Sequence, residues 1–155
     1  MNAYLNGSLA QETKESKSVT RVVNSVEIEG EQKYLILQEI KEDETDMILS
    51  DPYRMDACDV ICFTYDSSNP DSFSFVAELR EQYPVINDIP TVYAATKADL
   101  DRQEQRYVVQ PDVYTRELGI PAPIHVSTTW NATSDLFSFV AEAAVFPYSC
   151  TARYV

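Results

Sequence analysis

The chain has 155 residues, 45% of them apolar, and carries 25 acidic against 12 basic side chains for a net charge of −13. This length suffices for one domain with its own core and excludes two ordinary domains. A chain this acidic repels nucleic-acid backbones and anionic membrane surfaces, so we expect no nucleic-acid partner. The sequence also contains no apolar run near the roughly 18 residues of a membrane span, so we expect no membrane span in this chain.

The first third of the chain predicts a hairpin between two loops. Two β-rich runs, Val22–Ile28 and Tyr34–Ile40, are separated by Glu29–Gln32, and this spacing is typical of antiparallel neighbours. The other elements expected in this part are a helix end at Tyr4–Leu9, a polar loop at Gln11–Lys17, an acidic loop at Lys41–Asp46 and a short helix at Asp46–Arg54 interrupted by Pro52.

From Val60 onward, strand and helix patterns alternate. Val60–Tyr65 is a continuous apolar run, which suits a strand buried on both faces of a parallel sheet. Asn69 as N-cap and Pro70 at the first helical position then predict a helix that Pro84 ends. The remaining elements expected are the strand Thr91–Ala95, the helix Pro111–Leu118 stopped by Gly119, the strand Ile124–Val126 and the helix Ser134–Val145 stopped by Pro147.

This alternation predicts the fold class. Strands that alternate with helices require right-handed crossovers, which produce a doubly wound, mostly parallel α/β sheet with helices on both faces. On the last helix, Phe137, Val140, Ala141 and Ala144 form an apolar face that we expect to be core. We place one domain at residues 1–150 and a tail at 151–155.

Thr96-Lys97-Ala98-Asp99, directly after the Thr91–Ala95 strand, matches the guanine-reading signature of small GTPases. Open α/β sheets bind ligands at the carboxyl ends of their strands, which is where this segment lies. A carboxylate at Asp99 would accept both hydrogens of the N1 and N2 edge of guanine. We expect the methylene stem of Lys97 to lie along the base and the Thr96 hydroxyl to tie this loop to the neighbouring phosphate-side loop.

A second short strand ends in Ser127-Thr128-Thr129, at the distance expected for a partner loop. Here a backbone N–H of Ser127 or Thr128 would meet the guanine carbonyl, with Trp130 and Asn131 either shielding the base or capping the last helix. The alternative for Asp99 is a helix-capping aspartate after a strand.

The sequence predicts no metal site and no catalytic residue. His125, the single histidine, lies in an apolar strand run, where we expect a packed, neutral core residue. Cys58, Cys62 and Cys150 are odd in number and predict reduced, buried thiols in a reducing compartment.

With these motifs in order, the chain resembles a Ras-like small GTPase from Tyr4 to about Pro147, and more closely the C-terminal GTPase domain of the Miro family of mitochondrial Rho GTPases. The segments that carry this resemblance are Tyr34–Ile40, Asp56–Val60, Thr64–Phe73 and Ala98–Asp101. The resemblance implies GTP or GDP as ligand, with Mg²⁺ in the intact family domain. It also implies motor adaptors as protein partners and attachment to the cytosolic face of the mitochondrial outer membrane through an anchor that this sequence does not contain.

Two departures from the family pattern bear on hydrolysis. No Gly-x-x-x-x-Gly-Lys-Ser/Thr loop occurs among the 155 residues, which include only three glycines. Met1–Gly7 matches the stretch after that loop in the family, so we expect the first strand and the phosphate loop to be missing. This would leave two unpaired strand edges, unless another chain supplies the strand.

Gln38–Lys41 stands where small GTPases carry Asp-x-x-Gly, the segment that serves the metal shell and the γ-phosphate. Hydrolysis by this chain alone is therefore not expected. Two hypotheses remain open: part of a guanine-nucleotide-binding domain involved in mitochondrial distribution, morphology and tethering, or a non-catalytic pseudo-GTPase module that binds other proteins.

Overall fold

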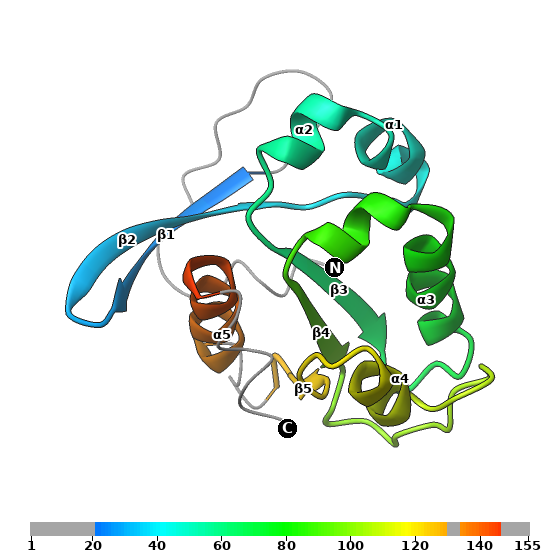
Figure 1. Ribbon diagram of the computed structural model, residues 1–155. Helices are drawn as coiled ribbons and strands as arrows, with labels where there is room; N and C mark the ends of the chain where they lie inside the picture. The colour runs from blue at the N-terminus through cyan, green and yellow to red at the C-terminus, as the bar shows by residue number, and fades with distance from the viewer. Residues whose placement is uncertain (1–20, 130–133, 147–155) are drawn as a thin grey trace.

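The computed structural model describes residues 21–129 and 134–146 (Figure 1). The strands are β1 (Arg21–Ile28), β2 (Glu31–Gln38), β3 (Ile61–Asp66), β4 (Thr91–Thr96) and β5 (Ile124–His125). The helices are α1 (Thr45–Leu49), α2 (Pro52–Asp56), α3 (Ser72–Gln82), α4 (Pro111–Glu117) and α5 (Ser134–Val145), with 3₁₀ turns at Glu42–Glu44 and Pro84–Asp88. The expectations for Tyr4–Leu9, Gln11–Lys17, Trp130, Asn131, Pro147, Cys150 and the tail 151–155 lie outside the described residues.

The predicted hairpin is confirmed, with a tighter turn than expected. β1 and β2 pair antiparallel, and Ile28 lies opposite Glu31, so only Glu29 and Gly30 form the turn. Their φ angles of 51° and 80° are both positive, as in the two-residue turns whose twist matches that of the flanking strands. β2 ends at Gln38, two residues before the expected Ile40.

The parallel sheet is also confirmed. β3, β4 and β5 form a three-stranded sheet in that order, and β4 pairs parallel with both neighbours. The strand that is buried on both faces is β4, in which Thr91–Ala95 are all buried. The same expectation for Val60–Tyr65 was wrong, because β3 is an edge strand of this sheet and alternates between buried and half-buried positions.

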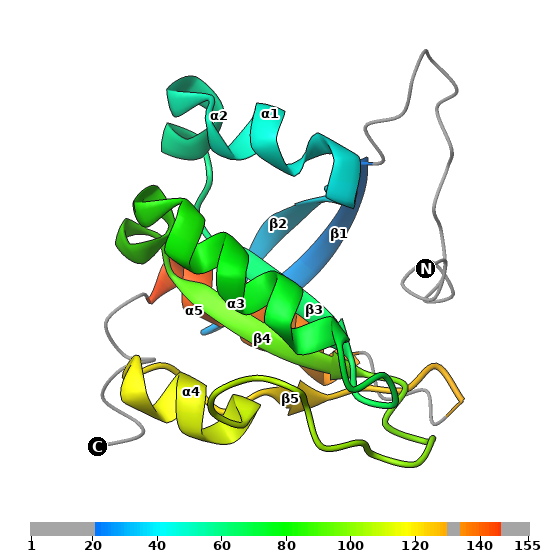
Figure 2. The same ribbon diagram turned by 90° about the vertical axis from the view of Figure 1, so that its right-hand side faces the viewer.

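Helices cover both faces of the parallel sheet, as the doubly wound pattern predicts (Figure 2). On one face, Phe73 and Ala77 of α3 pack with Tyr93 of β4 in an aromatic core. On the other face, Val140 of α5 packs with Val92 and with residues of the hairpin. The last helix has the expected bounds, and Val140 and Ala141 are buried while Phe137 and Ala144 are half-buried.

The described strands form two sheets rather than one. β1 and β2 make their own sheet, and β2 is not a hydrogen-bonded neighbour of β3. The two sheets are joined by α5, which contacts both β1 and β4 and shares its core with Ile28 and Leu35 of the hairpin.

Helix boundaries differ from expectation where side chains of distant residues intervene. The segment expected as an acidic loop, Lys41–Asp46, contains a 3₁₀ turn and the start of α1. The helix expected to begin at Pro70 begins at Ser72 instead. Asn69 accepts a hydrogen bond from the Asp71 backbone N–H, 3.0 Å away, and so caps the preceding turn rather than the helix. Gly119 stops α4 as predicted, with a φ of 69°.

Candidate functional site

The candidate site lies where β3, β4 and β5 end, because the carboxyl ends of parallel strands meet at one edge of a sheet. Three loops begin at or just after these strand ends, and the segments 66–68, 96–99 and 127–129 contain the last residue of β3, the last residue of β4 and the loop residues that follow each strand. The Ser67 N–H donates to the Thr96 carbonyl and the Ala98 N–H donates to the Val126 carbonyl, each at 3.1 Å. The backbone itself therefore fixes the middle loop against both of its neighbours.

Asp99 and the Ser127 loop come together as the sequence predicts. The Ser127 hydroxyl donates to one carboxylate oxygen of Asp99 at 2.6 Å, and the Thr129 hydroxyl donates to the other at 3.1 Å. The hydrogen bond from Ser127 is the largest cause of a lowered pKa of Asp99, so this group is ionised at neutral pH. Asp99 and Thr128 are exposed, whereas Ser127 is buried.

This arrangement leaves Asp99 able to bind a ligand. An ionised carboxylate offers about four acceptor positions, and the Ser127 and Thr129 hydroxyls together with the Asp99 backbone N–H occupy only part of them. Asp99 is exposed, so the rest of its acceptor capacity faces solvent, where the N1 and N2 donor edge of guanine can approach it. Asp99 does not cap a described helix, because the next helix, α4, begins at Pro111 with Gln110 as its N-cap.

Lys97 adopts a backbone conformation that is uncommon for a residue with a side chain. Its φ of 54° lies in the left-handed region, where non-glycine residues occur mainly when the surroundings impose the conformation. The Leu100 N–H donates to the Lys97 carbonyl at 3.0 Å and closes the loop at this position. The side chain of Lys97 then reaches the end of β3, where its ammonium group pairs with Asp66.

The Thr96 hydroxyl takes a different partner from the one expected. It donates to the Tyr65 carbonyl at 3.0 Å and so ties β4 to β3 rather than to a phosphate-side loop. Thr96 and Asp66 are register partners in the sheet. Thr96 thus holds the two strand ends together beneath the loop that contains Lys97.

Sequence reasoning missed Asp66 as a site residue. One oxygen of Asp66 accepts from the Ser68 N–H at 2.9 Å and from the Ser68 hydroxyl at 2.6 Å, while the other faces Lys97. Partial burial acts in the opposite direction, but the hydrogen bonds from Lys97 and Ser68 lower the pKa of Asp66 overall. The available signal was its position, since an aspartate directly after a parallel strand lies at the ligand-binding edge of the sheet.

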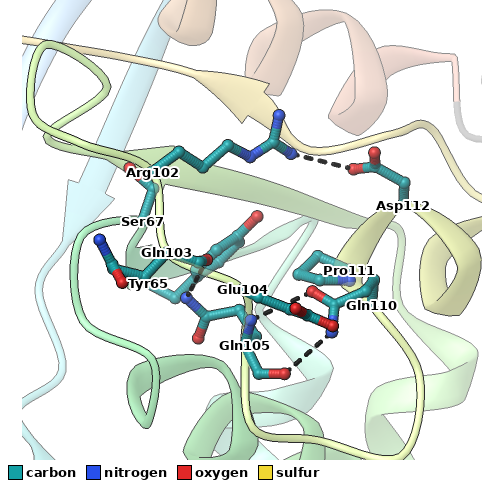
Figure 3. A pocket seen from close by; sticks show the side chains of 9 residues that line it. All are labelled: Tyr65, Ser67, Arg102, Gln103, Glu104, Gln105, Gln110, Pro111 and Asp112. Atoms are coloured by element: carbon teal, nitrogen blue, oxygen red, sulfur yellow. Dashed lines mark hydrogen bonds and ion pairs between the residues drawn. The ribbon is translucent and has the colours of Figure 1, made fainter.

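A cavity of about 280 Å³ lies beside these loops, between the end of β3, the segment 102–105 and the start of α4 (Figure 3). Arg102 and Asp112 pair across it at 3.6 Å. Tyr65, Ser67 and a group of glutamines contribute to its lining, but none of the five predicted nucleotide-binding residues does. The cavity is therefore a neighbour of the candidate site and not its base pocket.

The expectation of a core histidine was wrong. His125 lies in β5, but its side chain is exposed, because β5 is a two-residue edge strand. Partial desolvation, aided by Arg102, nevertheless lowers the pKa of His125, so the ring is neutral near pH 7 as expected. Cys58 and Cys62 are free and half-buried, and burial raises the pKa of Cys62 to about 12.

Neither a metal cluster nor a membrane span occurs in the described part of the chain. Over residues 21–129 and 134–146, no three acidic, histidine or cysteine side chains gather as metal ligands. Within the same ranges no helix combines the length and apolarity needed to cross a bilayer.

Comparison with known proteins identifies the family. No family model matches the chain. It is 54% identical over 134 residues to mitochondrial Rho GTPase 1 of Schizosaccharomyces pombe, a match that covers 85% of the chain and 21% of that relative. The protein of the same name from Neurospora crassa is 52% identical over 86% of the chain, and that from Yarrowia lipolytica is 45% identical over 95%.

The chain spans about a fifth of the length of these relatives. The similarity nevertheless covers most of the chain, including the sheet and the three loops of the candidate site. Together with the parallel α/β architecture, these matches show that the chain belongs with the mitochondrial Rho GTPases, as a partial GTPase domain of the Miro type.

Proposed function

We propose that this chain provides the guanine-binding part of a Miro-type GTPase domain, with GTP or GDP as its ligand. Asp99 would accept the N1 and N2 hydrogens of the base, and Lys97 would lie along one face of it. The Ser127 and Thr128 backbone would meet the guanine carbonyl, while Thr96 secures the loop from below. The observation that carries this proposal is the Asp99 carboxylate, which is fixed by Ser127 and Thr129 and is exposed where the parallel strands end.

The residues that the structure describes do not fit a magnesium site. The described ranges hold no group of three metal-ligating side chains, and Gln38–Lys41 replaces the Asp-x-x-Gly of small GTPases. We therefore derive no hydrolytic step for this chain. Residues other than 21–129 and 134–146 would have to hold Mg²⁺ and the phosphates of a bound nucleotide.

The name of the relatives, mitochondrial Rho GTPase 1, supports a mitochondrial role, and the resemblance to the Miro family implies the finer role that we propose. The complete protein would act at the cytosolic face of the mitochondrial outer membrane, in mitochondrial distribution, morphology and tethering, with motor adaptors as partners. The replacement at Gln38–Lys41 favours a second candidate, a pseudo-GTPase module that keeps the fold for protein binding. Magnesium-dependent phosphate release from the complete domain would contradict that candidate.

Calorimetric titration with GTP, GDP and ATP tests the base-binding proposal. We expect guanine-selective binding that Asp99→Asn weakens by roughly tenfold or more, because a hydrogen bond to a charged group contributes about 1.5–3 kcal/mol. Asp101→Asn is the matched control, since it removes the same charge two residues away without touching the Ser127 loop. Equal affinity for ATP and GTP, or equal loss in both variants, would refute the proposal.

A further inference from the structure

Among the described ion pairs, the one between Lys97 and Asp66 has the most enclosed carboxylate. The Asp66 side chain is 22% exposed, whereas the acidic partners in the other four pairs are 36–76% exposed. An exposed pair orders its side chains weakly, because both partners stay mobile in water. Asp66 differs from those carboxylates by being held at the end of a strand.

Asp66 is also fixed independently of Lys97. Ser68 donates both its backbone N–H and its hydroxyl to the same carboxylate oxygen, at 2.9 and 2.6 Å. The other oxygen is thereby turned toward the ammonium group of Lys97. The acceptor is oriented in advance, so the lysine meets a partner whose position is already set.

The backbone of Lys97 complements this arrangement. Its positive φ directs the side chain from the end of β4 across to the end of β3, and hydrogen bonds on both sides of the residue hold the conformation. Lys97 is thus anchored at both ends, by its backbone and by its ammonium group. The methylene stem runs between these anchors over the edge of the sheet, and the Lys97 side chain as a whole is 57% exposed.

We propose that Asp66 is a positioning residue for Lys97, which it holds so that the methylene stem forms one wall of the guanine pocket. This inference rests on the proposed function and adds a residue that does not touch the base itself. Asp66 would act on base affinity only through Lys97. Removing the Asp66 charge changes no atom of the Lys97 stem but takes away the partner of its ammonium group, so the stem is free to rotate.

A double-mutant cycle on the 155-residue chain tests the inference. We expect Asp66→Asn to weaken GDP binding by roughly two- to fivefold, the range for a partly exposed ion pair, with a smaller effect at high salt. In a Lys97→Met background, which keeps an unbranched stem without the charge, Asp66→Asn should have no further effect. Asp71→Asn, which breaks the exposed pair with Arg106, is the matched control and should leave affinity unchanged.

NMR order parameters of the Lys97 side chain provide a readout that does not require nucleotide. We expect the Lys97 ammonium and its adjacent methylene to be ordered in the unmodified chain and mobile in Asp66→Asn, with Lys33 unchanged as an internal reference. Equal mobility of Lys97 in both would overturn the inference, as would additive effects in the double-mutant cycle. Failure of the unmodified chain to bind GDP would instead refute the proposed function, and the order parameters would still decide the role of Asp66.

Discussion

Replacement of Gln105 by leucine should destabilise the fold by about 2 kcal/mol. Gln105 is 5% exposed, and its side-chain oxygen accepts from the Phe73 N–H at 3.0 Å, in the first turn of α3. The N-cap residue Asp71 makes no side-chain hydrogen bond to this helix, so Gln105 serves as its cap from 32 positions along the chain. The side-chain amide of Gln105 also donates to the Asn69 carbonyl at 3.0 Å and, over a longer distance of 3.4 Å, to the Gln103 carbonyl.

The magnitude follows from what each partner keeps after the substitution. The Asn69 carbonyl retains the Ser72 hydroxyl at 3.1 Å, so only the net value of one hydrogen bond is lost there, about 0.5–1.5 kcal/mol. The Phe73 N–H loses its cap, and an unpaired buried donor costs about 1–3 kcal/mol. The apolar leucine side chain offsets part of this sum, which leaves about 2 kcal/mol.

Urea unfolding followed by far-ultraviolet circular dichroism measures the change. Gln103→Leu is the matched control, because Gln103 is exposed and its substitution should cost less than about 0.5 kcal/mol. A free energy of unfolding for Gln105→Leu within 0.5 kcal/mol of the unmodified chain would refute the assignment of Gln105 as a distant helix cap.

Three further predictions concern single side chains. His125 should titrate below its ordinary pKa of about 6.5 in an NMR titration. Its contribution to stability is then complete above about pH 6.5 and is lost as the pH falls through the lowered pKa of the folded chain. A measured pKa above 6.5 would contradict this. In a Cys150→Ser background, a thiol reagent at pH 8 should modify Cys58 well before Cys62, because burial raises the pKa of Cys62 to about 12. Equal rates of modification would show that Cys62 is open to solvent. Tyr93→Phe should be neutral or stabilising by up to about 1 kcal/mol in thermal unfolding, because the buried Tyr93 hydroxyl lacks a well-formed hydrogen bond within the described residues. A clear loss of stability would reveal a hydrogen-bond partner for this hydroxyl.

Local patterns predicted the order and type of the elements from β1 to α5. Periodicity, turn chemistry and the position of proline and glycine are properties of neighbouring residues, so α5 could be placed at Ser134–Val145 and the end of α4 at Gly119. The start of α3 was misplaced by two residues because its cap, Gln105, lies in a distant part of the chain. Interactions over such separations leave no local signal.

Burial was predicted less well than secondary structure. An apolar strand run predicts burial only when other strands flank it, and the sequence does not give the strand's place in the sheet. His125 is less buried than expected because β5 is an edge strand of the three-stranded sheet. The same reason applies to β3, which is the other edge strand.

At the candidate site, the Thr96–Asp99 motif and Ser127 were found because they occur in a recognisable order along the chain. Asp66 was not, because its role depends on the path of a single lysine side chain across two strand ends. A residue that acts through another residue is visible only once the fold brings the two together.

Exchange of the nucleobase tests the central claim most directly. Guanine presents two donors on its N1 and C2 positions, whereas xanthine presents a donor and a carbonyl acceptor there. The unmodified chain should bind GDP in preference to XDP, and Asp99→Asn, whose amide offers one acceptor and one donor, should reverse this preference in the same calorimetric titration. An unchanged preference in the variant, or equal binding of both nucleotides by the unmodified chain, would contradict the assignment of Asp99 as the residue that reads the base.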